Sequence, residues 1–186
     1  MNKWSIACLS LIVFSVGCGN TSSPVTESAA SSGAPAASTK SASPTVKRDP
    51  CSLLTKEEVS AALGTKMREA HSDDGIHCLY SDLIGGTGAT VTFMSAANNI
   101  EVKTMFTNSK QVTKDRGDKG FQEITGIGDE AYSGSGNDLN VRKGDVYFGI
   151  GLNSVAALSE PGRRDQIYAD FLEKEKSLAE KVLARI

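Results

Sequence analysis

A long low-complexity segment near the N-terminus sets the limits of what this chain can fold into. Residues 19–48 contain 21 Ser, Thr, Ala or Pro residues out of 30, and Val25 and Val46 are their only larger aliphatic side chains. Such a segment cannot bury enough apolar surface to offset the entropy lost on ordering. We therefore expect a disordered stalk, and a single folded domain confined to residues 49–186. O-glycosylation of the stalk is an alternative to a plain spacer, and composition leaves it open.

The first 17 residues have the pattern of a secretion signal. Lys3 precedes an uncharged apolar run from Ile6 to Val16, which is too short to cross a bilayer as a helix. The run ends in Gly17-Cys18, which resembles the lipobox of bacterial lipoproteins, where the cysteine thiol receives a diacylglycerol. The resemblance implies that residues 1–17 are a signal peptide and that lipid on Cys18, the first residue of the 18–48 segment, holds the protein at a membrane. An ordinary cleaved signal, with Cys18 lost or free, is the alternative.

The remaining 138 residues carry 16 Lys and Arg against 21 Asp and Glu, a net charge of about -5. A nucleic-acid-binding domain normally carries a basic excess, so nucleic acid is not an expected partner. A domain of this size is expected to have one hydrophobic core.

Three helices are predicted. Thr55 and Glu58 have the spacing of a capping box, and Gly64 follows Leu63, which together predict a helix over 56–63. A middle helix is predicted over about 99–108, with Asn98 as its N-cap. A long amphipathic helix is predicted at the C-terminus from one apolar stripe: Ile167, Phe171, Leu178, Val182 and Ile186.

Other segments alternate apolar and polar residues with period two, as strands do. The apolar positions are Ile76, Cys78 and Tyr80; Val91 and Phe93; Leu139 and Val141; and Val146, Phe148, Ile150 and Leu152. Gly144 suits a tight turn between the last two segments, and another turn is expected over 134–138. The pattern predicts an α+β fold: a mostly antiparallel sheet with a short N-terminal helix, a middle helix and a long C-terminal helix packed on it.

Cys51 and Cys78 are the two cysteines of the predicted domain. In an exported protein an even pair is most simply a disulfide, which would tie the start of the first helix to the first strand. A redox pair is the alternative, although the spacing is not C-x-x-C.

One segment concentrates residue types that bind metals. His71, Asp73, Asp74 and His77 fall within seven residues, and imidazole nitrogen and carboxylate oxygen both bind divalent cations. The same residues are typical of a solvated polar turn, which is the favoured interpretation. A divalent-metal-binding envelope protein is the alternative function.

No catalytic constellation is recognised in the sequence. There is no G-x-S-x-G motif, and both histidines fall in one predicted loop. Gly126, Gly128 and Ala131 fit the dinucleotide pattern G-x-G-x-x-A, but a strand rather than a helix is expected to follow. We therefore expect no enzymatic activity and no cofactor apart from the covalent lipid. A site assembled from distant acids is the enzymatic alternative.

The domain opens with Asp49-Pro50-Cys51-Ser52-Leu53-Leu54-Thr55, continuing to Glu58-Val59, and resembles a family of small bacterial lipoproteins of unknown function. In that family a second cysteine lies near a tyrosine, here Cys78 and Tyr80, and a G-x-G-D-x-A-Y strand follows, here Gly126 to Tyr132. The resemblance implies a Cys51–Cys78 bridge and a compact α+β domain similar to the PsbP and Mog1 fold. It implies no activity.

The expected protein is thus an extracytoplasmic lipoprotein of the bacterial cell envelope, acting as a non-catalytic binding or accessory module. Gly19 follows the anchor where a retention-type Asp would stand, which favours the outer membrane in a cell that has two. A protein or cell-wall partner is compatible with this expectation, and the ligand is not specified by the sequence.

Overall fold

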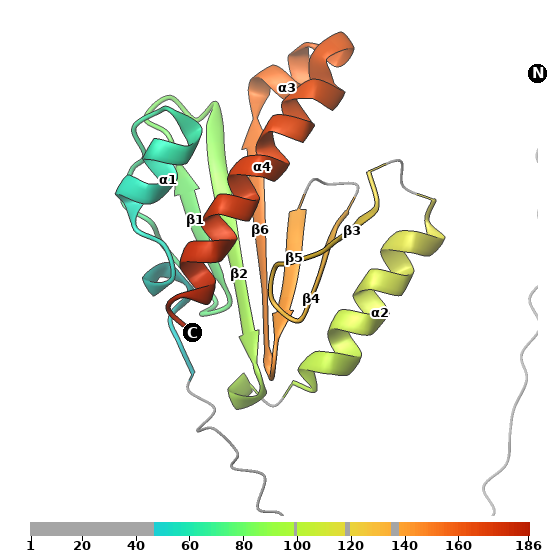
Figure 1. The fold of residues 1–186 in the computed structure, drawn as a ribbon. Helices are drawn as coiled ribbons and strands as arrows, with labels where there is room; N and C mark the ends of the chain where they lie inside the picture. Colours follow the sequence, from blue (N-terminus) through green and yellow to red (C-terminus); the bar gives the residue numbers. More distant parts are fainter. Residues whose placement is uncertain (1–46, 99, 118–119, 135–137) are drawn as a thin grey trace, which may run out of the picture. The chain divides into compact units, whose positions relative to one another are not determined.

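The computed structural model describes residues 47–98, 100–117, 120–134 and 138–186, and these build one antiparallel sheet with helices on both faces (Figure 1). The predicted α+β class is confirmed, including the long C-terminal helix. The strands are β1 (His77–Ser81), β2 (Thr87–Ser95), β3 (Gln122–Ile124), β4 (Glu130–Ser133), β5 (Asp138–Lys143) and β6 (Val146–Ser154). Their order across the sheet is β1-β2-β6-β5-β4-β3, so β6, the last strand in sequence, lies near the centre.

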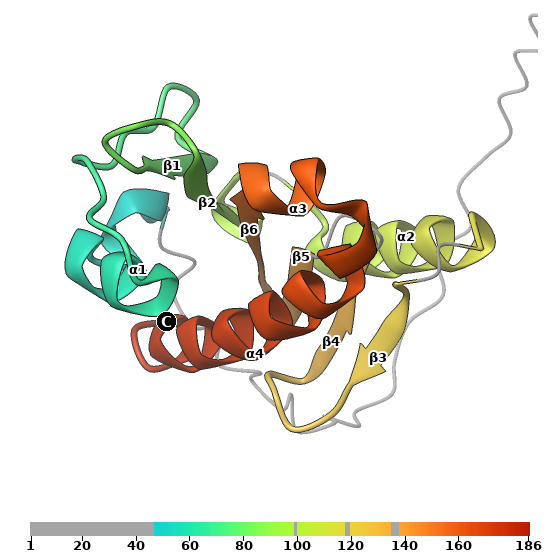
Figure 2. The same cartoon turned by 90° about the horizontal axis from the view of Figure 1, so that it is seen from above.

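Helices cover the two faces of the sheet unequally. The helices are α1 (Lys56–Leu63), α2 (Val102–Asp115), α3 (Val155–Ser159) and α4 (Arg164–Leu183), with short 3-10 turns η1 (Pro50–Ser52), η2 (Ala96–Asn98) and η3 (Pro161–Arg163). Seen from above, α4 crosses one face of the sheet and α2 lies against the other (Figure 2). None of the helices in the described part of the chain has the length and apolarity that a membrane span requires.

The sequence-predicted capping of α1 is confirmed. The Thr55 hydroxyl accepts a hydrogen bond from the Glu58 amide at 3.2 Å, and the Glu58 carboxylate accepts one from the Thr55 amide at 2.8 Å. Gly64 ends the helix with φ at +70°, a conformation in which glycine has no Cβ penalty.

The predicted middle helix exists, but its predicted boundaries are wrong. It runs from Val102 to Asp115 instead of 99–108, and Glu101 rather than Asn98 occupies the cap position. The Asn98 side-chain oxygen instead accepts hydrogen bonds from the backbone amide and the hydroxyl of Ser95. Asn98 therefore closes the turn at the end of β2 and is not free to cap α2.

The hydrophobic core lies between the sheet and α4. Alternate residues of the central strands face it, including Val91, Phe148 and Ile150, and from α4 they meet Leu178 and Val182. These α4 residues belong to the stripe that the sequence predicted.

A smaller cluster lies on the other face, beneath α2. The Phe106 ring meets the rings of Tyr132 and Tyr147 edge to face, with centroids 5.3 Å and 5.7 Å apart. Val102 completes the buried part of this cluster. It is much smaller than the α4 core, so α2 covers only part of its face.

The Cys51–Cys78 disulfide is present and joins η1 to β1, as predicted. The two ends of the described domain also meet, because the Arg48 guanidinium donates to the Arg185 carbonyl at 2.6 Å. Gly144 forms the predicted turn between β5 and β6 with φ at +55°. The central residues of the predicted turn over 134–138, residues 135–137, lie outside the described residues.

Candidate functional site

Three central strands form a groove on the sheet face opposite α4. Two rows of directly paired residues cross β2, β6 and β5 in that order: Thr90–Gly151–Asp138 and Thr92–Gly149–Asn140. Side chains alternate between the two faces of a strand, so these six residues share the face that Val91, Leu139 and Ile150 turn away from. The groove has threonines on one side, a carboxylate and an amide on the other, and glycines between them.

The glycines make the floor of the groove. A Cβ atom on Gly151 would lie 2.3 Å from the Asp138 Oδ1 atom, and one on Gly149 would lie 3.4 Å from the Asn140 Oδ1 atom. Asp138 and Asn140 therefore extend across β6 only because no side chain stands in their way. A molecule in the groove would therefore meet the Asp138 carboxylate and the Asn140 amide above the glycine backbone.

Three of the polar side chains have unused hydrogen-bonding capacity. Among the described residues, no hydrogen bond or ion pair is formed by the Asp138 carboxylate or by the hydroxyls of Thr90 and Thr92. Thr90, Thr92 and Gly151 are partly exposed and Asp138 is exposed, so water satisfies them when the groove is empty of solute. The groove thus presents both donors and acceptors that a ligand can take over from water.

Tyr147 closes one end of the groove. Its ring is packed beneath α2 against Phe106, and its hydroxyl donates to the Asn140 Oδ1 atom at 2.6 Å. The Asn140 Nδ2 atom donates to the backbone carbonyl of Asp138 at 2.9 Å, which leaves one of its N–H groups for a further partner. These two bonds hold the Asn140 amide in one orientation.

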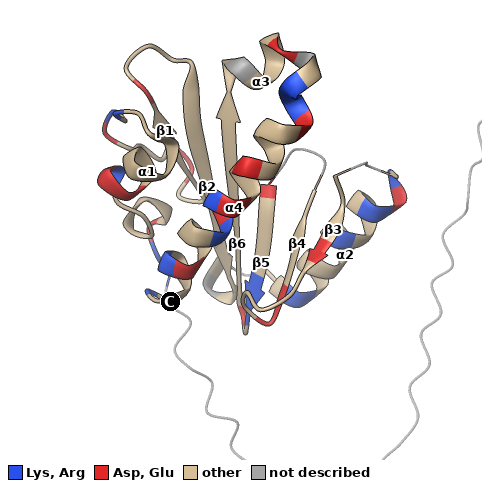
Figure 3. Ribbon diagram, turned by 45° about the horizontal axis from the view of Figure 1, so that its top comes forward, with Lys and Arg blue, Asp and Glu red and all other residues tan. Residues whose placement is uncertain are grey.

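The electrostatics of the groove are dominated by one carboxylate. β2 and β6 contain no charged residue, whereas the helices, the loops and the strands β3 to β5 carry charged residues (Figure 3). Loss of solvation against the sheet raises the pKa of Asp138, although part of its surface stays open to solvent. A desolvated carboxylate without a cationic partner favours a ligand that donates hydrogen bonds to it.

The cavity at this position is small, with a volume of about 120 Å³. Three wider hollows of about 500–580 Å³ occur elsewhere and are more open to solvent. One lies beside the disulfide where the described chain begins, one lies between α4 and the β3–β4 connection, and one lies beside α1. The small groove differs from these hollows because unpartnered polar groups converge there from two strands, β2 and β5.

A fully buried glutamate lies on the opposite face of the same strands. Glu175 of α4 accepts a hydrogen bond from the Leu152 amide through its Oε1 atom at 2.9 Å, and its Oε2 atom has no partner within the described residues. Burial raises the pKa of Glu175 to about 9, and the negative charge of Asp138 adds to the shift. Glu175 is therefore neutral at neutral pH and adds no negative charge near Asp138.

The four candidate metal ligands of the sequence do not gather into one site. The His77 Nδ1 atom lies 2.5 Å from the Asp74 Oδ2 atom, whereas His71 forms a backbone bridge with Leu79. In the described part of the chain, no hydrogen bond or ion pair joins Asp73 to either imidazole. Within the described ranges, no three His, Cys, Asp or Glu residues are placed so that they could share a metal ion.

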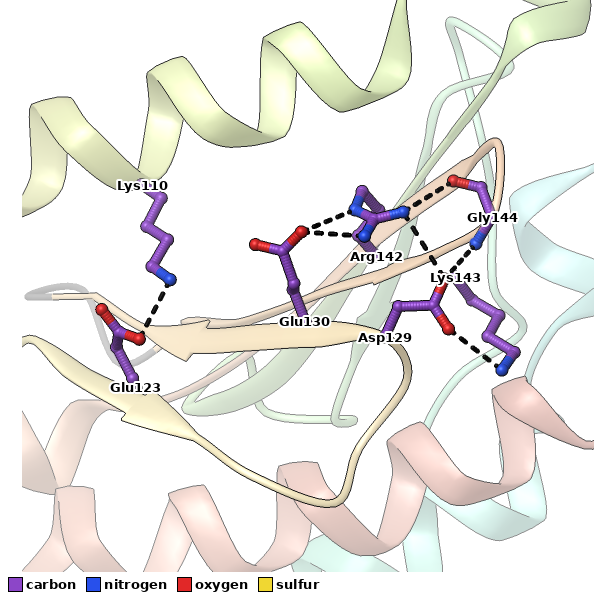
Figure 4. Close-up of polar contacts among 7 residues, drawn as sticks. All are labelled: Lys110, Glu123, Asp129, Glu130, Arg142, Lys143 and Gly144. Carbon is purple, nitrogen blue, oxygen red and sulfur yellow. Dashed lines mark hydrogen bonds and ion pairs between the residues drawn. The ribbon is translucent and has the colours of Figure 1, made fainter.

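The acids of the G-x-G-D-x-A-Y motif join the start of β4 to β5 and the β5–β6 turn, a set of contacts that we call the structural lock (Figure 4). The Asp129 carboxylate accepts from the Gly144 amide at 2.8 Å and from the Lys143 ammonium at 3.1 Å. The Arg142 guanidinium donates to the Glu130 carboxylate at 2.8 Å. Both acids are therefore paired within the protein, and the chain continues as β4 rather than as a helix, as the sequence indicated.

Gly128 lies at the centre of this lock. Its φ is +62°, and a Cβ atom there would come within 2.6 Å of both the Arg142 carbonyl oxygen and the Val141 Cγ1 atom. The turn thus brings its backbone so close to β5 that only glycine fits.

Sequence reasoning did not find the groove. Its residues lie on strands that the sequence did predict, but on the face opposite the apolar positions that predicted them. A signal is present in the polar and small residues between the apolar ones: Thr90 and Thr92, Asp138 and Asn140, Gly149 and Gly151. Their convergence depends on strand order, which periodicity does not specify.

Sequence reasoning also overlooked Glu175. It stands four residues after Phe171 and three before Leu178, so it interrupts the apolar stripe of the C-terminal helix. A charged residue within such a stripe indicates a buried carboxyl group. The predicted lipidation site, Cys18, lies outside the described residues.

These features define a small disulfide-bonded α+β domain with an open polar sheet face. The chain belongs to the family described as proteins of unknown function, DUF3558, which matches residues 13–139. The match covers α1, both cysteines of the disulfide and the strands through β4, whereas β6 and α4 lie beyond it. No curated protein and no solved structure matches the chain. Likeness to the PsbP and Mog1 fold therefore stays a prediction.

Proposed function

We propose that this protein is an exported lipoprotein of the bacterial cell envelope, and that its folded part is a non-catalytic binding or accessory module. The observation that carries the proposal is Gly17-Cys18 at the end of a short apolar run, followed by a stalk rich in Ser, Ala and Pro. The family match begins at residue 13 and so includes Cys18. A diacylglycerol on that thiol supplies two acyl chains, which is enough for stable anchoring.

The disulfide supports export. Disulfides form and persist in oxidising compartments and are rare in the bacterial cytoplasm. Cys51 and Cys78 are bonded across 27 residues and tie η1 to the buried strand residue Cys78. A protein that relies on this bond fits the extracytoplasmic side of a membrane.

The described side chains favour binding over catalysis. The His77–Asp74 pair is exposed, and no hydroxyl or thiol among the described residues is hydrogen-bonded to the His77 imidazole. The carboxyl group with the largest rise in pKa, Glu175, is fully buried, so a substrate does not reach it. The accessible groove offers hydrogen bonds, but it contains no nucleophile hydrogen-bonded to a general base.

Anchoring is tested by comparing Cys18→Ala with Cys8→Ala in the native host. Both changes remove one thiol from the N-terminal region, but only Cys18 stands where the lipobox cysteine stands. The wild type and Cys8→Ala are expected to fractionate with membranes and to incorporate radiolabelled palmitate. Cys18→Ala is expected to lose the label and to leave the lipoprotein fraction. If Cys18→Ala still took up palmitate at the wild-type level, the anchoring proposal would be wrong.

A further inference from the structure

We propose that the groove formed by the rows Thr90–Gly151–Asp138 and Thr92–Gly149–Asn140 binds one neutral sugar ring of an envelope glycan. The inference deepens the proposed binding function and rests on it, since it names the ligand class of the module. It stands on the positions of the hydrogen-bonding groups, on the charge of the groove and on its size.

The hydrogen-bonding groups surround the floor rather than meeting at one point. Residues two apart along a strand are separated by about 6.7 Å, and strands two apart by about 9.5 Å, so the four polar side chains start from the corners of a rectangle of that size. Thr90 and Thr92 lie along one short side, and Asp138 and Asn140 lie along the other. Such a frame matches a ring that carries hydroxyl groups around its edge.

The mixture of donors and acceptors selects among ligand chemistries. A threonine hydroxyl both donates and accepts, the free Asn140 N–H donates, and the Asp138 carboxylate only accepts. An ammonium group could use the carboxylate but would leave the donors unused, because it has no acceptor. A sugar hydroxyl uses both kinds, since it donates to a carboxylate while accepting from an amide or another hydroxyl.

Charge excludes an anionic ligand at this position. Asp138 is the groove's single charged side chain among the residues the structure describes, and it has no cationic neighbour there to neutralise it. A phosphate or carboxylate ligand would meet a like charge at short range. The sugar is therefore a neutral one.

The volume limits the ligand to one ring at a time. The cavity, of about 120 Å³, is smaller than a whole hexose, so only part of one ring enters it. Tyr147 blocks the end beneath α2, so the rest of a glycan chain leaves towards the open part of the sheet. Because Gly149 and Gly151 carry no side chains, the Asp138 and Asn140 side chains lie over β6, and the ring meets their polar groups at the base of the groove.

The test uses the full-length protein purified in detergent from the cell envelope, with the disulfide intact. Binding is measured by isothermal titration calorimetry with hexamers of glucose, mannose, galactose and N-acetylglucosamine, and with spermidine as the cationic probe. Asp138→Asn and Thr92→Val remove hydrogen bonds from opposite sides of the groove. Asp145→Asn and Thr107→Val change exposed residues outside it and serve as matched controls. Circular dichroism confirms that each variant is folded.

The inference predicts saturable binding of at least one hexamer, weakened at least fivefold by Asp138→Asn and by Thr92→Val and unchanged by both controls. Binding of spermidine without any hexamer would overturn it, as would sugar binding that neither groove variant weakens. Failure to bind any hexamer also overturns it. Anchoring is measured independently, by palmitate incorporation at Cys18. A failure to bind sugar therefore does not contradict the lipoprotein proposal.

Discussion

Replacing Glu175 with Gln should stabilise the protein at neutral pH. The glutamate is fully buried on α4, and its Oε2 atom has no partner in the described part of the chain. Burial raises its pKa from 4.5 to about 9, so the folded protein keeps a proton that the unfolded chain releases. Between these two pKa values the unfolded state binds fewer protons, and stability therefore falls as pH rises.

The size of the effect follows from the two pKa values. Neutral pH lies about 2.5 units above the ordinary value of 4.5, and each unit corresponds to about 1.4 kcal/mol. The wild type is therefore expected to lose about 3 kcal/mol between pH 4.5 and pH 7 through this group, a large part of the total stability of a small domain. Glutamine keeps the shape and the acceptor for the Leu152 amide but does not titrate.

The assay is urea unfolding followed by far-ultraviolet circular dichroism, at pH values from 4 to 8. The variant should gain about 3 kcal/mol over the wild type between pH 4 and pH 7. Glu173→Gln is the matched control, because Glu173 lies on the exposed side of α4 and pairs with Lys176. Its difference from the wild type should change little with pH. A Glu175→Gln difference that is independent of pH, or that reverses sign towards pH 7, would refute the reasoning.

Two further predictions concern covalent and backbone constraints. Replacing both Cys51 and Cys78 with Ser should cost about 3.5 kcal/mol of unfolding free energy, since the bridge closes a loop across 27 residues; urea unfolding with and without dithiothreitol checks this, and a wild type insensitive to reduction would contradict it. Gly128→Ala should cost more than about 2 kcal/mol, because the new Cβ would meet the Arg142 carbonyl at 2.6 Å. Gly126→Ala, at φ +84° with nothing within 4 Å, should cost only about 1 kcal/mol, and equal losses would argue against the close approach.

The boundaries of α2 show where local signals are insufficient. Asn98 followed by Glu101 is an acceptable helix start by local rules, yet Asn98 bonds back to Ser95 at the end of β2. The helix also continues seven residues past the predicted end at 108, to Asp115. Contacts with distant residues accompany this extension: the Ser109 hydroxyl bonds to that of Tyr132, and Lys110 pairs with Glu123. Such contacts decide a helix end when local preferences are weak.

The short strands β3 and β4 show the same limit in the sheet. β3 has three residues, too few for a period-two pattern to be recognised, and it exists because it pairs with β4. The G-x-G-D motif was recognisable in sequence, but its role was not. Carboxylates such as those of Asp129 and Glu130 can bind ligands. In the structure, however, they already pair with Gly144, Lys143 and Arg142.

The sequence by itself determined the elements whose causes are local. The capping box at Thr55 and Glu58, the C-terminal Gly64 and the long apolar stripe of α4 each act within a few residues, so they are readable without knowledge of the fold. The α+β class followed from the same kind of evidence, whereas the Cys51–Cys78 bond followed from the presence of two cysteines in a domain expected to be exported.

Only the tertiary structure decided the groove and the environment of Glu175. Inserting β6 between β2 and β5 brings Thr90, Gly151 and Asp138, which are 13 to 61 positions apart in the chain, into one row. The same insertion places the end of β6 against α4, where the Leu152 amide meets the Glu175 carboxyl group. Hydrogen-bonding capacity and pKa depend on which groups are neighbours in space, and strand order, which no local pattern encodes, sets those neighbours.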